Sequence, residues 1–192
     1  MENLNEVSLS EGLVPEGVIA HAKVRLTRGG HITDLYTDGW ATKSKSSEAV
    51  FLVCDFVILD GEYKDCMIKT NIGLFSEKSD FYRDMGLRTR RRIIDSAYNL
   101  DEKVEDSRRN IENYGVLDGL VCVIKSKVKI EQYNGVDRSK NDVIVLTPRD
   151  EEYKAFKLQS EATTSGNGRY KIEATKKKAV PEVELIDDEI PF

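Results

Sequence analysis

Hydrophobic side chains alternate with a period of two residues in two blocks of the chain, and a block with a helical period separates them. Every second side chain of residues 18–26 is apolar, and residues 49–59 are apolar on both alternating faces apart from Asp55. Because alternate residues of a strand share one face, this pattern predicts a strand with one buried side over residues 18–26 and a strand buried on both sides over residues 49–59. The chain is therefore expected to be mainly β.

Turn signals separate the other strand candidates. We predict a short strand over residues 31–37, a return strand over residues 63–72, and two later strands over residues 119–133 and 142–147. Asp60-Gly61 marks the first hairpin, and Asn134-Gly135 is a strong second signal, although residues 136–140 would make that loop long. Residues 38–48 are rich in Ser and Thr, which is typical of a mobile loop.

The middle of the chain has a helical period. Within residues 79–113 a first helix has one apolar face, and a second, charged helix is expected from Asp101 to Asn113. The apolar face consists of Leu87, Ile94, Ala97 and Tyr98. This order fits an α+β fold, a five-stranded OB-fold-like barrel with a helical insertion between strands 3 and 4, and other α+β folds fit nearly as well.

The two ends of the chain differ in composition from its middle. We expect an acidic leader over residues 1–16, one domain over residues 17–158, and a flexible, disordered tail over residues 159–192, where the hydrophobic pattern fails. Residues 181–192 contain five acids and no base, which equals the whole net charge of −5. The acidic composition therefore does not exclude a polyanionic ligand, because binding depends on local patches of charge.

Several classes of protein are unlike this sequence. Its longest apolar run, residues 49–54, is far shorter than the roughly 20 residues of a membrane-spanning helix, and its acidic start is unlike a secretory leader. Three widely spaced cysteines without a CxxC pair indicate reduced thiols, so we expect a cytoplasmic protein. With His21 and His31 as the only histidines, we expect no metal site, no cofactor and no enzymatic activity.

An aromatic side chain and two bases lie together in the predicted mobile loop. Trp40 offers a flat ring on which a nucleobase could stack, and Lys43 and Lys45 could contact phosphates. The alternative is a solvated loop with Trp40 folded back onto the core. The residues alone do not separate the two interpretations.

Two strands carry a second set of candidates. Lys125, Lys127 and Lys129 share one face, which Tyr133 continues, and their mutual repulsion would be relieved by an anion. The alternative is an edge strand that lysines protect against aggregation. Tyr63, Met67 and Lys69 likewise share a face of the predicted return strand, where they could extend a binding groove or merely cover the barrel.

Arginine is concentrated in the first predicted helix. Arg88 and Arg92 are expected opposite its apolar face, Arg91 at the rim and Arg90 inside that face. The basic cluster could bind phosphates, and it consists of Arg83, Arg88, Arg90, Arg91 and Arg92. The alternative is a solvated helix face paired with acids of the second helix, namely Glu102, Glu105 and Asp106.

Two segments resemble known families. The sequence DDEIPF, residues 187–192, is similar to the acidic tip of bacterial single-stranded DNA-binding proteins. The segment VCDFVILDGEYK, residues 53–64, followed later by Tyr133-Asn134-Gly135, resembles a phage family of OB-fold single-stranded DNA-binding proteins. Asp65 stands where that family often has Gly, and the helical segment is long.

These resemblances imply a non-enzymatic protein that coats single-stranded DNA in replication, recombination and repair. They imply no individual DNA contact. The tip would recruit a helicase, polymerase, primase or nuclease by docking in a basic pocket of that partner. Its residues are Asp187, Asp188, Glu189, Ile190, Pro191 and Phe192. The alternative is an OB-fold adaptor that binds only proteins, and whether the chain forms a homo-oligomer stays open.

Overall fold

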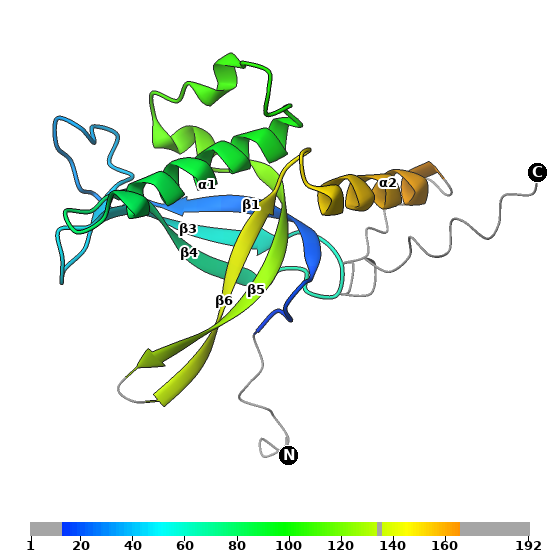
Figure 1. Cartoon of the computed structure of the whole chain (residues 1–192), viewed down its shortest axis with the longest axis horizontal. Helices are drawn as coiled ribbons and strands as arrows, with labels where there is room; N and C mark the ends of the chain where they lie inside the picture. Colours follow the sequence, from blue (N-terminus) through cyan, green and yellow to red (C-terminus); the bar gives the residue numbers. More distant parts are fainter. Residues whose placement is uncertain (1–12, 134–135, 166–192) are drawn as a thin grey trace, which may run out of the picture.

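The fold is mainly β, and the described part of the chain forms one antiparallel sheet of six strands and two α-helices (Figure 1). The computed structural model describes residues 13–133 and 136–165. The strands are β1 (Ile19–Thr27), β2 (Thr42–Lys43), β3 (Val50–Ile58), β4 (Met67–Phe75), β5 (Val121–Tyr133) and β6 (Val136–Leu146). The predicted mainly β class is confirmed, and β2 is an additional short strand within the predicted mobile loop.

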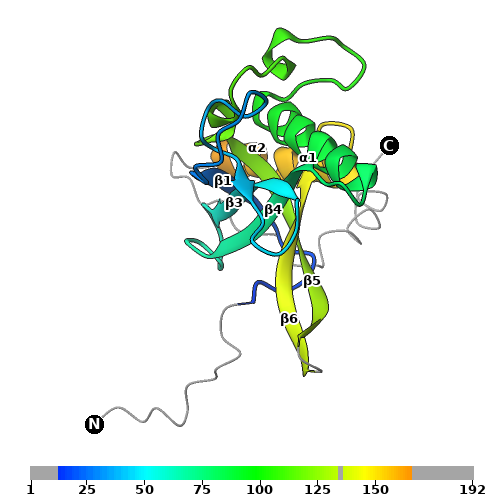
Figure 2. The same ribbon diagram turned by 90° about the vertical axis from the view of Figure 1, so that its left-hand side faces the viewer.

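The pairing of the strands sets the faces of the sheet. β3 pairs with β4, β1 and β2, β1 also pairs with β5, and β5 pairs with β6. The sheet is open, because within the described residues no ladder joins β4 to β6. Figure 2 shows the paired strands β5 and β6 extending beyond the rest of the sheet.

The core lies on one side of these strands, as the alternation predicts. Ala20, Ala22, Val24 and Leu26 of β1 are all buried, and they pack with alternate residues of β3, β4 and β5. The outward side chains of β3 other than Asp55 are only half-buried. The expectation that residues 49–59 are buried on both faces is therefore wrong for the outward face.

α1 (Asp80–Tyr98) packs on β4 and follows it in the chain. Two glycines allow this contact, because a Cβ built on Gly86 would lie 1.7 Å from the carbonyl oxygen of Gly73. The predicted apolar face is wrong in part, since Leu87 and Tyr98 are exposed. Gly86 and Arg90 instead lie among the buried residues of α1, because β4 covers a different face of the helix.

The predicted second helix over residues 101–113 is absent. α1 ends at Tyr98 and is capped by Asn99, which has a left-handed φ of 53°. The segment that follows contains only the short turns η2 (Ser107–Arg109) and η3 (Tyr114–Leu117). Side chains hold these turns, since Asp106 accepts from the amide of Arg108 and Asn113 accepts from the amide of Gly115. Such local bonds compete with helical hydrogen bonds.

Two more strand predictions need correction. Residues 31–37 form no strand, and only an isolated bridge joins Thr33 to Tyr36. The loop between β5 and β6 is not long, because Tyr133 pairs directly with Val136 across the two residues of the turn signal. The long antiparallel ladder of β5 and β6 includes the residues that were assigned to the loop.

α2 (Glu151–Ser165) is a helix that the sequence analysis missed, and it continues past residue 158. Tyr153 and Phe156 form a small second core with three residues of the outward sheet face. Those residues are Ile19, Val123 and Leu146. α2 therefore covers one end of the outward face of the sheet, and it crosses the predicted domain boundary at residue 158, while residues 166–192 of the predicted tail lie outside the described part of the chain.

The folded part also begins earlier than residue 17. Val14 is buried, its amide donates to the Oδ1 atom of Asn141 over 2.8 Å, and its carbonyl accepts from the Nδ2 atom of Asn141 over 2.7 Å. None of the helices in residues 13–133 and 136–165 combines the length and the apolar character that a membrane-spanning helix requires.

Candidate functional site

The outward sides of β1, β3 and β4 form a continuous surface that α2 does not cover. We call this surface the open strand face. It consists of Lys23, Arg25, Thr27, Val53, Asp55, Val57, Met67, Lys69 and Asn71. The residues of β1 and β4 in this set are exposed, and the two valines of β3 are half-buried. The surface therefore presents three cations, with the apolar side chains of Val53, Val57 and Met67 between and beside them.

The strand register places two of these cations around one buried carboxylate. Arg25 of β1 pairs with Asp55 of β3, and Asp55 pairs with Lys69 of β4. The Nη2 atom of Arg25 lies 3.0 Å from the Oδ2 atom of Asp55, and the Nζ atom of Lys69 lies 4.0 Å from its Oδ1 atom. Asp55 is only 5% exposed, so this carboxylate holds both cations above the sheet.

One oxygen of Asp55 is incompletely satisfied. Its Oδ1 atom is buried and has no hydrogen-bond partner within the described residues. Arg25 also donates to the sulfur of Met67 over 3.1 Å, which fixes the guanidinium over the strands. The face thus carries two held cations and a third, Lys23, against a single carboxylate.

Lys69 is the sequence-predicted residue that lies on this face, together with its neighbour Met67. Tyr63 does not lie there, because β4 begins only at Met67 and Tyr63 is half-buried against the core in the preceding turn. Sequence reasoning missed Lys23 and Arg25. The sequence pattern could have identified both residues, since they alternate with the buried residues of β1 and must lie on its outward side.

Trp40 packs against the core rather than standing free. A Cβ built on Gly115 would lie 2.6 Å from the indole nitrogen of Trp40, and the guanidinium of Arg28 lies 4.4 Å from the ring centroid. Lys43 forms an ion pair with Glu48 over 2.6 Å, whereas Lys45 is exposed. This geometry favours the interpretation that Trp40 folds back onto the core.

The lysines of β5 are mostly paired with acids. Lys125 contacts Glu152 of α2, and Lys129 contacts Asp142 of β6. The pKa of Asp142 lies below its usual value. Burial raises this pKa, but the hydrogen bond and the charge of Lys129, together with hydrogen bonds from the backbone of Val143 and the side chain of Thr70, lower it by more. Lys127 is exposed. The side chain of Tyr133 and the whole of residues 187–192 lie outside the described part of the chain.

The arginines of α1 divide into two groups. Arg92 does not face solvent freely, because it donates to the carbonyl of Val145 and to Asp150, each over 2.6 Å. Arg91 donates to the carbonyl of Glu102 rather than to a carboxylate of that segment. Arg88 is exposed, and Arg90 is buried as predicted.

The cysteines of the core are not activated. Burial raises the pKa of the Cys122 thiol to about 12, and burial likewise raises the pKa of Cys54, with the nearby Cys122 and Asp55 adding to the effect. Both therefore stay protonated at neutral pH. Within residues 13–133 and 136–165, no group of three or more His, Cys, Asp or Glu side chains could hold a metal ion.

Two comparisons with known proteins found no match to this chain. No protein-family model matches the chain, and no curated protein matches it significantly. The function is therefore argued from the residues and their arrangement.

Proposed function

We propose that this chain is a single-stranded DNA-binding protein that holds the strand on the open strand face. The observation that carries the proposal is the row formed by Arg25, Asp55 and Lys69, with apolar side chains on either side of it. Cations can contact phosphates, and apolar surface can contact bases, so the face offers both kinds of contact that an unpaired strand needs.

The strand order supports an OB-type barrel as the scaffold. Apart from the two-residue β2, β1 pairs with β3 and β5, β3 pairs with β4, and β5 pairs with β6, while α1 follows the third of these strands. The OB fold has this arrangement and binds oligonucleotides over its second and third strands. Those strands correspond to β3 and β4. Thr70 of β4 donates to Asp142 of β6 over 3.4 Å, so the edge strands approach each other.

The same surface distinguishes this function from the alternative, an adaptor that binds only proteins. A protein-binding surface needs no row of cations, and salt would affect its affinity only modestly. Contacts to phosphates release counterions, so the affinity for a strand falls steeply as salt rises. The salt dependence of oligonucleotide binding therefore separates the two functions.

The experiment is a fluorescence-anisotropy titration of labelled oligo(dT) with the full chain at two salt concentrations. Removing one phosphate contact by Lys69→Ala or Arg25→Ala should weaken binding about 3- to 10-fold and lower the salt slope by about one. Lys154→Ala, on an exposed turn of α2, is the matched control and should bind as the unchanged chain does. Equal binding by all three variants, or no binding at low salt, would contradict the proposal.

We also propose that the segment DDEIPF recruits enzymes of DNA replication or repair. Its three acids and its apolar Ile190 and Phe192 suit a basic pocket with an apolar floor on a partner. In this role, the single-stranded DNA and the partner protein bind different parts of the chain. A protein of this kind can then hold DNA and a partner at the same time.

A further inference from the structure

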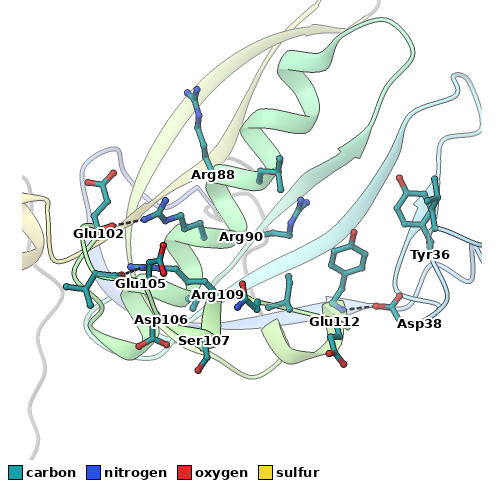
Figure 3. Close-up of a pocket in the computed structure, with 18 of the residues that line it drawn as sticks. Tyr36, Asp38, Arg88, Arg90, Glu102, Glu105, Asp106, Ser107, Arg109 and Glu112 are labelled. Atoms are coloured by element: carbon teal, nitrogen blue, oxygen red, sulfur yellow. Dashed lines mark hydrogen bonds between the residues drawn. The ribbon is translucent and has the colours of Figure 1, made fainter.

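The aromatic rings of the pocket beside α1 are not placed to stack on a strand that lies on the open strand face. Tyr36 and Tyr114 line this pocket, which shares no residue with the open strand face (Figure 3). Figure 3 shows Asp38 and Glu112 on the same side of the pocket as Tyr36. Carboxylates there repel a chain with a phosphate at every nucleotide. The bases of a bound strand therefore need a stacking surface elsewhere.

The open strand face itself contains no aromatic residue, and the nearby rings lie beyond its ends. On β1 the next outward residue is His21, whose ring lies 4.8 Å from that of Phe156 and whose side chain is only 15% exposed. On β3 the next outward residue is Phe51, which is half-buried. Phe75, at the end of β4, lines a separate pocket with the loop that carries Tyr36. A base at the centre of the face thus lacks the aromatic partner that single-stranded DNA commonly finds on a protein.

The side chain of Arg25 extends across this centre. It starts on β1, and its Nη2 atom donates to the Oδ2 atom of Asp55 on β3 over 3.0 Å and to the sulfur of Met67 on β4 over 3.1 Å. Neighbouring strands lie about 4.8 Å apart, so a side chain that reaches the second strand must run across the sheet. The two acceptors fix the plane of the guanidinium. The side chain of Arg25 is nevertheless 55% exposed, so a base can reach that plane from solvent.

A guanidinium in this setting offers two kinds of contact at once. It is planar and weakly hydrated, and nucleobases stack on its face. Within the described part of the chain, Arg25 uses only its Nη2 atom for hydrogen bonds, so the N–H groups of Nε and Nη1 stay available for a phosphate in the same plane. The ammonium groups of Lys23 and Lys69 have no flat face, so they can contact phosphates but cannot stack.

We propose that Arg25 is the stacking platform for a base of the bound strand, and that Asp55 is the positioning residue that sets its plane. This inference rests on the proposed binding of single-stranded DNA to the open strand face. It also defines the ligand more closely. A polyanion without unpaired bases can contact the cations of this face but not the plane of Arg25, so it binds more weakly than a strand with bases.

The test compares labelled oligo(dT) with an abasic oligonucleotide of the same length and charge, by fluorescence anisotropy with the full chain. The ratio of the two affinities measures the contribution of the bases. We expect the unchanged chain to prefer oligo(dT). Arg25→Lys keeps the charge and removes the plane, so it should lower the ratio about fivefold, mostly by weakening oligo(dT), and leave the salt slope unchanged.

A second variant separates positioning from charge. Asp55→Asn removes the negative charge between the cations, so it should strengthen binding of the abasic oligonucleotide. It also removes the charge-assisted bond that holds Arg25, so the ratio should fall. A carboxylate that acted only through its charge would change both affinities equally. Arg149→Lys is the matched control, because Arg149 is exposed, pairs with Glu102 and lies outside the open strand face, and it should leave the ratio unchanged.

The outcomes distinguish the inference from the proposed function on which it rests. Equal affinities of the unchanged chain for the two oligonucleotides would overturn stacking and leave binding through phosphates. An unchanged ratio in Arg25→Lys would also overturn it, as would a ratio lost in Phe51→Leu but kept in Arg25→Lys. Failure of both oligonucleotides to bind at low salt would overturn the proposed function together with the inference.

Discussion

At the scale of single residues, the contact between Gly73 and Gly86 shows how one missing side chain determines the packing of a helix. α1 approaches β4 so closely that the backbones touch, and Arg90 can then reach the carbonyl of Gly73. Glycine in a helix normally lowers stability, because it loses more backbone freedom than alanine does. Here the close approach outweighs that cost.

Replacing Gly86 by alanine should therefore destabilise the protein, opposite to its usual effect in a helix. The new Cβ would overlap the carbonyl of Gly73, so α1 must move away from β4, and we expect the free energy of unfolding to fall by about 1–3 kcal/mol. Chemical denaturation measures this change. Asp84→Ala, at an exposed position of the same helix, is the control and should change stability by less than about 0.5 kcal/mol. A Gly86→Ala chain as stable as the original would show that the helix can shift without cost.

Residue-level patterns also show why the sequence predicted only part of the candidate site. Lys69 was found because its strand has a clear alternation, whereas Lys23 and Arg25 were overlooked although they alternate just as clearly. Asp55 could be recognised as an exception in an apolar strand, but its role depends on the register that brings Arg25 and Lys69 beside it. Register joins residues far apart in the sequence, so local patterns did not reveal it.

At the scale of elements, the strands were more predictable than the helices. Alternation identified β1 and the first half of β5, where one side is buried, and the nearly unbroken apolar run identified β3. Residues 101–113 have the composition of a helix, yet Arg109 binds Asp95 and two backbone carbonyls, and asparagine and aspartate side chains close local turns. α2 was missed because only Tyr153 and Phe156 of its side chains are buried in the second core, too few for a helical period to be visible.

The small second core makes α2 sensitive to a single substitution. Phe156→Ala removes one of its two buried aromatic rings, which also contacts the ring of His21 at 4.8 Å between centroids. We expect a loss of about 3–5 kcal/mol if α2 unfolds together with the sheet, and a smaller loss if it detaches first. Hydrogen exchange of the amides of α2, compared with those of β3, distinguishes the two cases. Leu158→Ala, at a residue that is 68% exposed, should leave both rates unchanged.

At the scale of the whole molecule, charge is divided between the folded part and the last residues of the sequence. Residues 181–192 hold five acids, while the open strand face carries three cations against one carboxylate. A tethered anionic segment competes with DNA for a cationic surface, because tethering raises its local concentration. The proposed tail and the proposed DNA site are thus expected to oppose each other.

Removing residues 187–192 should leave the affinity for oligo(dT) equal or higher, because a competing anionic segment is lost. Capture of a purified replicative helicase or polymerase by the immobilised chain should be lost at the same time. Anisotropy and surface plasmon resonance measure the two properties on the same preparation. Replacing only Ile190 and Phe192 by alanine keeps the acids, so it should abolish capture without raising DNA affinity. A markedly weaker affinity for DNA after the deletion would refute the division of roles.

The pair of hydrogen bonds between Val14 and Asn141 has a practical consequence for anyone who shortens this protein. The periodicity of the sequence suggests starting at Gly17, yet a chain cut there would lose the backbone groups of Val14 that pair with the buried side-chain amide of Asn141 in the middle of the β5–β6 ladder. An unsatisfied buried amide costs about 1–3 kcal/mol, a large share of the stability of a small domain. A shortened chain should therefore keep the residues from Leu13 onward if the long hairpin is to hold its position.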